Sequence, residues 1–270
     1  MRLLLMACGL LLVAACNAQP AETPTQPEPP RFEVVSADPV EHGERLSAVL
    51  GCTGCHTPGL TGEDWSEPEL GVLWTANLTR SAAAYSHDEL AAMITEGRRP
   101  DRALIDMPSA LFTEMHPADI DALVTYLKSL NPKGAVQPAP TIGPQLAKQI
   151  ATGEFKDSVQ QVAEMRGQFP PDMGSAHDYG RFIVRATCVE CHGMDLRGGK
   201  QMAGAMPVDL RVMKLYSAEE FSTLLQTGKA LGDRELELMS AVARRRYARF
   251  TEAEREAVFG YLTEVARREP

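Results

Sequence analysis

The sequence lacks a basic stripe, a membrane-length apolar run and recognisable strands. Its formal net charge is −9 at pH 7 and only 6% of its residues are aromatic, and no cluster of Lys and Arg interleaved with aromatic residues occurs, which argues against nucleic-acid binding. The apolar run at residues 3–15 is too short to span a bilayer comfortably. Because no convincing strand run is present, while apolar residues recur at helical spacing, we predict an all-α fold.

Cysteines are also few, and four of the six fall into two short strings. Cys8 and Cys16 lie within the first sixteen residues. The others belong to two copies of Cys-x-x-Cys-His, which contain Cys52, Cys55, His56, Cys188, Cys191 and His192. This string is the attachment signature of c-type haem, because two thiols at this spacing can add to the vinyl groups at one porphyrin edge and the histidine then supplies a ligand to the iron. The sequence therefore predicts two covalently bound haems c.

Two other uses of the paired cysteines stay open at this point. Structural zinc sites use two Cys-x-x-Cys pairs roughly 15 to 20 residues apart, whereas Cys55 and Cys188 are separated by 133 positions. A disulfide within each pair is plausible in an oxidising compartment. It would leave His56 and His192 without a purpose, so haem attachment explains more of the pattern.

The N-terminal residues predict export and lipidation. Arg2 precedes the apolar run, and residues 13–16 resemble the lipobox of bacterial lipoproteins, in which cleavage leaves Cys16 as a lipidated N-terminus. Ordinary cleavage after Ala15 or Ala18, which would give a soluble periplasmic protein, is the alternative. We expect a signal peptide at residues 1–15 and a lipidated Cys with a Pro-rich spacer at residues 16–36. The protein would then be lipid-anchored to a membrane on the periplasmic side of the bacterial cell envelope.

The rest of the chain repeats one pattern with an offset of about 131 to 136 residues, so we predict duplication of a whole domain. Pairs of residues mark the repeat: Gly43 and Gly180 precede the two strings, Ser86 and Ser217 begin the motif Ser-x-x-Glu, and Tyr126-Leu127 and Tyr261-Leu262 lie near the ends. The predicted boundaries are 37–132 for the first domain, 133–175 for an inter-domain connection and 176–270 for the second domain. The connection is expected to contain one or two short helices and to wrap the interface between the domains.

Helix starts are visible in both copies. Ser86-x-x-Glu89, Ser217-x-x-Glu220 and Thr251-x-x-Glu254 have the form of capping boxes, in which side chains satisfy the free N–H groups of a first helical turn. Pro117 suits the first turn of the last helix of the first copy. Each copy is therefore expected to be mostly helical, with a covalently held porphyrin completing a thin core.

This pattern resembles the class I cytochromes c, and the tandem arrangement resembles the dihaem cytochrome c subunits that accompany bacterial membrane-bound dehydrogenases. The resemblance covers residues from about 40 to 267 without the connection. It implies two tandem cytochrome c domains, each wrapped around one haem. In such domains a glycine of the first helix faces an aromatic residue of the last. Gly43 with Tyr126, and Gly180 with Tyr261, fit these places.

The resemblance also implies a methionine as the second axial ligand of each iron, from a loop ahead of the final helix. Met107, followed by Pro108, lies 51 residues after His56 and is the prediction for the first domain. Met239 lies 47 residues after His192 and is the prediction for the second. Met93 and Met115 compete with Met107, and Met206, which is followed by Pro207, comes too early in the second copy.

Charge differs between the two halves. Residues 31–135 hold eight Lys or Arg against sixteen Asp or Glu, a balance of −8, whereas residues 136–270 hold eighteen of each. The first half should therefore attract a basic partner. Arginines near Met239, namely Arg244, Arg245, Arg246 and Arg249, are either a solvated helix face, a partner for a propionate or a docking surface for an acidic partner. The remaining histidines, His42, His87, His116 and His177, are expected to be solvated rather than ligands.

These observations predict an electron carrier. The protein would pass single electrons between redox partners in the bacterial cell envelope, as part of a respiratory chain or dehydrogenase complex. No catalytic residue is predicted. The alternative is a dihaem enzyme such as a cytochrome c peroxidase or a thiosulfate-oxidising enzyme, which needs an open or unusual distal ligand. A candidate Met in both halves, and no spare Cys in the mature chain, argue against it.

Overall fold

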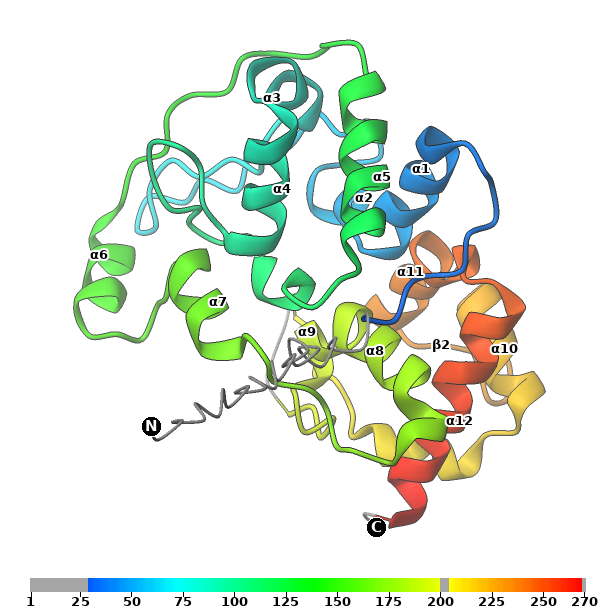
Figure 1. Cartoon of the computed structure of the whole chain (residues 1–270). Coiled ribbons are helices and arrows are strands. Elements are labelled where there is room, and N and C mark those ends of the chain that lie inside the picture. The colour runs from blue at the N-terminus through cyan, green and yellow to red at the C-terminus, as the bar shows by residue number, and fades with distance from the viewer. Residues whose placement is uncertain (1–28, 200–203, 269–270) are drawn as a thin grey trace, which may run out of the picture.

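The structure is a computed structural model that describes residues 29–199 and 204–268, and these residues are almost entirely helical (Figure 1). The α-helices are α1 (Pro39–Val49), α2 (Cys52–Cys55), α3 (Leu78–Ala84), α4 (His87–Glu96), α5 (Pro117–Ser129), α6 (Pro144–Ala151), α7 (Ser158–Met165), α8 (Asp178–Thr187), α9 (Val189–His192), α10 (Ala218–Thr227), α11 (Leu238–Arg245) and α12 (Glu252–Arg268). Four short 3₁₀ helices join them: η1 (Ser109–Phe112), η2 (Ser175–His177), η3 (Leu210–Leu215) and η4 (Tyr247–Arg249). In the described residues the strands are limited to β1 (Lys229–Ala230) and β2 (Arg234–Glu235), which pair antiparallel. The predicted all-α fold is confirmed.

The helices form two groups. In Figure 1, α1 to α5 make the upper part of the molecule and α8 to α12 the lower part, while α6 and α7 lie at the left. In the upper group α1 packs against α5, and in the lower group α8 packs against α12. The chain between the groups contains the two short helices α6 and α7, as the sequence predicted for the connection.

The predicted helix starts are present with their hydrogen bonds. At α4, the N–H of Glu89 donates to Ser86 Oγ at 3.2 Å and the N–H of Ser86 donates to Glu89 Oε2 at 2.7 Å. Ser217 and Glu220 make the same pair at α10. Thr251 and Glu254 do so at α12. Each cap satisfies N–H groups that have no partner inside the helix, an effect of typically ~1 kcal/mol.

Both pairs of first and last helices touch through a glycine. A Cβ atom placed on Gly43 would lie 2.1 Å from Ala122 O and 2.7 Å from the Cβ of Tyr126. One placed on Gly180 would lie 2.1 Å from Ala257 O and 2.7 Å from the Cβ of Tyr261. Only glycine allows two backbones to approach this closely. The predicted contacts of Gly43 with Tyr126 and of Gly180 with Tyr261 are therefore confirmed.

The two groups share a buried interface. Arg185 of α8 is 1% exposed, and its guanidinium donates to Leu111 O at 2.7 Å and to Thr113 Oγ1 at 2.9 Å in the upper group. Arg45 of α1 forms a 2.9 Å ion pair with Glu254 of α12, whose side chain is fully buried. Buried charges are tolerated only when they are paired or hydrogen-bonded. Both contacts therefore fix how the two groups sit against each other.

The packed part of the chain begins earlier than the predicted end of the spacer at residue 36. Phe32 is 1% exposed and its ring lies 5.3 Å from the ring of Phe182. The N–H of Phe32 donates to Asp119 Oδ2 at 2.8 Å, and Arg31 forms an ion pair with the same carboxylate. Phe32 therefore lies in the core, while the exposed Arg31 is held to it through the buried carboxylate of Asp119. The predicted signal peptide and Cys16 lie outside the described residues.

One histidine departs from its predicted environment. His42 is 1% exposed, and its Nε2 lies 3.1 Å from Asp119 Oδ1, so the expectation of a solvated side chain is wrong at this position. His42 therefore lies in the interface between α1 and α5, which contains Asp119. His116 caps α5 by accepting the N–H of Ala118 at 3.1 Å. His87 is partly exposed, and its Nε2 lies 3.0 Å from Asp121 Oδ1.

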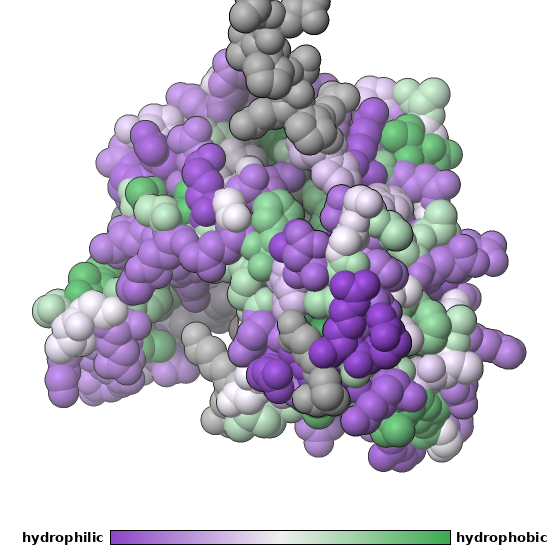
Figure 2. All heavy atoms as spheres, turned by 60° about the horizontal axis from the view of Figure 1, so that its bottom comes forward, coloured by the Kyte–Doolittle hydropathy of each residue, from purple (hydrophilic) through white to green (hydrophobic). Residues whose placement is uncertain are grey.

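The surface is mainly hydrophilic on the face drawn in Figure 2, where apolar side chains form small separate patches. Across residues 29–199 and 204–268, no helix combines the length and the apolar character needed to cross a membrane.

Candidate functional site

The first Cys-x-x-Cys-His string occupies a turn that its neighbouring glycine makes possible. Gly51 has φ +86°, in the left-handed region that favours glycine, and α2 starts directly after it. Cys52 and Cys55 are the first and last residues of α2, and His56 ends the helix. Both cysteines are free thiols, as are Cys188 and Cys191, so the structure does not contain the disulfides of the alternative interpretation. Burial raises the pKa of Cys52 to about 11, which keeps this thiol protonated at neutral pH.

His56 is oriented by the backbone. Its Nδ1 lies 2.7 Å from Ala76 O. A carbonyl oxygen can only accept, so Nδ1 carries the proton and Nε2 keeps its lone pair. Burial lowers the pKa of His56, which favours the neutral ring. A neutral imidazole whose other nitrogen donates to a carbonyl is the form in which histidine ligates metals.

A cavity of about 1230 Å³ opens beside this histidine, and Cys55, His56 and Met107 all line it. Ligand sites for drug-sized molecules have volumes of about 300–1,000 Å³, so the cavity suits a larger group. Apolar and aromatic side chains supply much of its wall, among them Leu70, Leu73, Trp74, Tyr85, Met93, Leu104 and Leu146. The structure therefore brings together both predicted axial ligands of the first haem with one of its attachment cysteines.

Met107 is held by a residue that the sequence did not point to. Its N–H donates to Ser158 Oγ at 2.9 Å, and the N–H of Ser158 donates to Leu104 O at 3.0 Å. Ser158 is fully buried at the start of α7. The sequence analysis did not single out Asp157-x-x-Gln160, a capping box present in the structure that could have located the start of α7. Helix α7 thereby fixes the loop that carries Met107.

The connection forms part of the cavity wall. Gln137 lines the cavity, accepts the N–H of Asn77 at 2.9 Å and donates to Thr75 O at 2.8 Å. Farther along, the N–H of Thr141 donates to Val72 O at 3.0 Å. Residues 136–140 and α6 therefore cover the first site. The expectation that the connection wraps the interface is met only near its end, where Gln168 O accepts Arg185 Nε at 2.7 Å.

Two arginines add positive charge to the cavity. Arg99 and Arg102 both line it, and Arg99 donates to the hydroxyl of Tyr85. Burial, together with the nearby charge of Arg99, lowers the pKa of Arg102. Arg99 already pairs with Asp101 at 3.1 Å, a carboxylate that also lines the cavity, so Arg102 is the cation better placed for a further anionic group such as a carboxylate. The sequence analysis missed both residues, because nothing in their spacing relates them to the string at residues 52–56.

The cysteines, the neutral histidine, the methionine and the guanidinium of Arg102 fit a covalently attached haem with its propionates. Residues 40–131 match the family model for cytochrome c. This part of the chain is a cytochrome c domain. The match covers Gly43, the string at residues 52–56, Met107 and Tyr126, and a domain of this family supports an electron-transfer haem protein. No curated protein matches the chain.

The second string lies beyond the matched cytochrome c domain and has similar local geometry. His192 ends α9, and its Nδ1 lies 2.8 Å from Val208 O, so its Nε2 also keeps the lone pair. Burial lowers the pKa of His192 as well. Met239 lies in the first turn of α11 and packs partly buried against the core, whereas Met206 is 60% exposed. Ligation of one iron by His192 and Met239 stays a prediction.

The arginines near Met239 separate into two kinds. Arg244 forms a 3.0 Å ion pair with Glu235 at the surface, and Arg245 and Arg249 are exposed, as a solvated face requires. Arg246 is different, because it is 8% exposed and lies between the two strings. Sequence spacing could not distinguish it from its neighbours.

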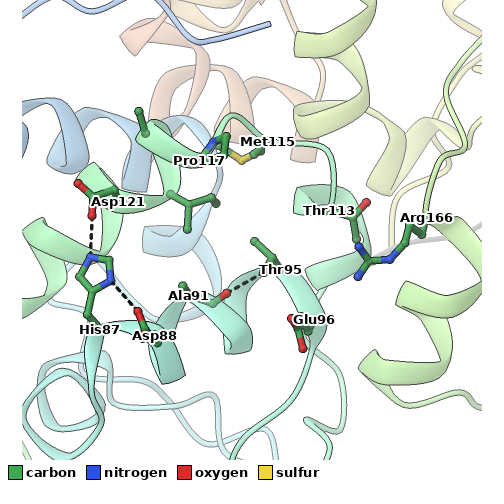
Figure 3. A pocket seen from close by; sticks show the side chains of 12 residues that line it. His87, Asp88, Ala91, Thr95, Glu96, Thr113, Met115, Pro117, Asp121 and Arg166 are labelled. Carbon is green, nitrogen blue, oxygen red and sulfur yellow. Dashed lines mark hydrogen bonds and ion pairs between the residues drawn. The ribbon is translucent and has the colours of Figure 1, made fainter. Parts of the chain in front are cut away.

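A second cavity, of about 580 Å³, lies between α4 and α5 and contains none of the predicted haem ligands. Figure 3 shows His87 between Asp88 and Asp121 on one side of it, with Glu96 and Arg166 on the other. In the part of the chain that the structure describes, no three His, Cys, Asp or Glu side chains form a metal-binding group. The zinc alternative thus gains no support from the described residues.

Proposed function

We propose that this protein is a dihaem c-type cytochrome that carries single electrons between redox partners in the bacterial cell envelope. The observation that carries the proposal is the repeated local geometry. Each Cys-x-x-Cys-His string lies on a short helix after a long one, and each histidine donates Nδ1–H to a backbone carbonyl, at 2.7 Å for His56 and 2.8 Å for His192. Because both histidines are oriented by the same type of hydrogen bond, we expect one haem at each string.

The bound haems would supply reversible one-electron redox chemistry at iron. The residues of the chain determine where and at what potential this occurs. Cys52 and Cys55 would hold the first haem by thioether bonds, with His56 and Met107 on the iron. Cys188 and Cys191 would hold the second, with His192 and Met239. A thioether ligand and an apolar surrounding both favour the reduced state, so Met107 and Met239 would raise the potentials of bound haems.

Electron transfer is favoured over a dihaem enzyme by the position of Met107. An enzyme such as a peroxidase needs an iron with an open or displaced distal ligand. In the cavity of the first string, His56 and Met107 line the same space, and Ser158 holds the backbone of Met107 in place. With a haem bound, Met107 held in this way would occupy the position that a substrate needs on that iron.

Attachment to the membrane and the choice of partner extend the proposal. Lipidation of Cys16 would tether the protein to the membrane, and the mass of the mature N-terminal peptide would reveal the lipid. The acidic balance of residues 31–135 suits a basic redox partner. Reduction by such a partner should then slow as salt rises, since salt screens exposed charge.

Covalent haem is the decisive property to measure. The purified protein should keep haem-dependent peroxidase staining after denaturation, with two haems per chain. Replacing Cys52 and Cys55 with Ala should remove half of the haem, and replacing Cys188 and Cys191 with Ala should remove the other half. Extraction of haem by acidified acetone, or one haem per chain in the unaltered protein, would contradict the proposal.

A further inference from the structure

A single guanidinium joins the two Cys-x-x-Cys-His strings. Arg246 follows α11, and its Nε donates to Val49 O at 3.2 Å while its Nη2 lies 3.4 Å from Thr187 O. A Cβ on Gly51 would lie only 2.7 Å from the Cζ of Arg246. Gly51 immediately precedes Cys52, and Thr187 immediately precedes Cys188. The same side chain therefore touches the residue before each string.

Arg246 is buried and stays positively charged. Arg246 is 8% exposed, and its nearest acidic partner is Glu190, inside the second string, at 3.4 Å. Burial opposes the charge, but Tyr247, Glu190 and Cys188 outweigh it and raise the pKa of Arg246. Its guanidinium lies beside the backbone that leads into each string, at Val49 O ahead of Cys52 and at Thr187 O ahead of Cys188. One fixed cation therefore acts on both attachment sites.

A second contact strengthens the junction. Tyr247, the next residue, donates its hydroxyl to Thr187 O at 2.7 Å, and its ring stacks on Phe250 at 5.0 Å. Arg246 and Tyr247 thus fix the turn before the second string, while Arg246 alone reaches back to the first. Helix α11, which precedes these residues, also contacts α2.

We propose that Arg246 is a positioning residue that clamps the two attachment turns together and places one positive charge beside both haems. This inference rests on the proposed dihaem function. Reduction adds an electron to each centre, so a nearby cation stabilises the reduced state of both and raises both potentials. Because the cation is buried, salt screens it weakly. The clamp also fixes the separation of the two centres, across which an electron must tunnel.

The test compares Arg246→Met with Arg245→Met. Both variants remove one positive charge, but Arg245 is exposed while Arg246 is buried at the junction. Optical redox titration should show both haem potentials lowered in Arg246→Met and nearly unchanged in Arg245→Met. Arg246→Lys keeps the charge and loses the planar fork, so its potentials should stay near those of the unaltered protein. A shift of one potential only, or equal shifts in the two Met variants, would overturn the proposal.

Haem content is measured on every sample before titration, so that loss of the dihaem function is recognised separately. If Arg246→Met fails to fold, Glu190→Gln provides the opposite change, because it removes the negative charge beside the same cation. Both potentials should then rise. Unchanged potentials in Glu190→Gln would count against a shared electrostatic centre.

Discussion

At the scale of single residues, the first site depends on Ser158, which positions Met107, as well as on the predicted ligands themselves. The resemblance to cytochromes c pointed to Met107, and the structure places it on the same cavity as His56. Ser158 could not be predicted, because it meets Met107 across 51 residues through one hydrogen bond, and such a contact leaves no periodic trace. Arg99 and Arg102 were missed for the same reason. His42 was misjudged because its burial depends on Asp119, a residue of another helix.

Replacing Ser158 with Ala should therefore weaken Met107 as a ligand. The change removes the acceptor of the Met107 N–H, and an unsatisfied buried donor costs about 1–3 kcal/mol. We expect the near-infrared band of the Met–iron bond to be lost at a lower temperature than in the unaltered protein, and the potential of the first haem to fall. Ser129→Ala is the control, since Ser129 is exposed and bonds only Tyr126 O within its own helix. Identical behaviour of the two variants would exclude a positioning role for Ser158.

At the scale of helices, the sequence was most informative where one local rule decides the structure. Capping boxes at Ser86, Ser217 and Thr251 marked helix starts because they satisfy N–H groups within four residues. The contact of Gly43 with Tyr126 followed from the resemblance, and the structure contains it. The wall that residues 136–140 build was not predictable. It depends on backbone pairing between loops about 70 residues apart, as Thr141 with Val72 shows.

Two glycines of the second helix group should respond oppositely to alanine. Gly180→Ala would place a Cβ 2.1 Å from Ala257 O, so α8 and α12 would have to separate. We expect a loss of about 1–3 kcal/mol in the free energy of unfolding. Gly260, inside α12, has open space around it, and Gly260→Ala should be neutral or stabilise by about 0.4–1 kcal/mol. Urea unfolding curves measure both, and a stable Gly180→Ala would show that the crossing tolerates a side chain.

At the scale of the whole molecule, the repeat predicted two units, but it did not predict how they join. Arg185 was one arginine among many in the sequence. In the structure its partners are the carbonyls of Ala110 and Leu111, which lie on the other helix group and have no side-chain signature. Arg45 and Glu254 are likewise 209 positions apart. Contacts of this kind depend on the completed fold, so a local pattern could not indicate them.

Removing Arg185 should loosen the two groups from each other. Arg185→Met removes the donor to the carbonyl oxygens of Leu111 and Gln168, and we expect a loss of about 3 kcal/mol in the free energy of unfolding. The two groups should then unfold in separate transitions. Arg181→Met is the control, because Arg181 lies on the same helix but bonds Pro170 O and Asp172, outside the upper helix group. A single transition at the same urea midpoint in both variants would contradict this view of the interface.

The cavity wall contributed by residues 136–140 has a consequence for how this chain can be divided in evolution. The match to the cytochrome c family model ends at residue 131. Part of the wall of the cavity beside His56 nevertheless comes from residues that follow this match. A recombination event that transferred residues 40–131 alone would transfer His56 and Met107 without residues 136–140, which form part of the cavity wall around them. The heritable module is therefore longer than the recognisable motif, and it extends at least to Ser158.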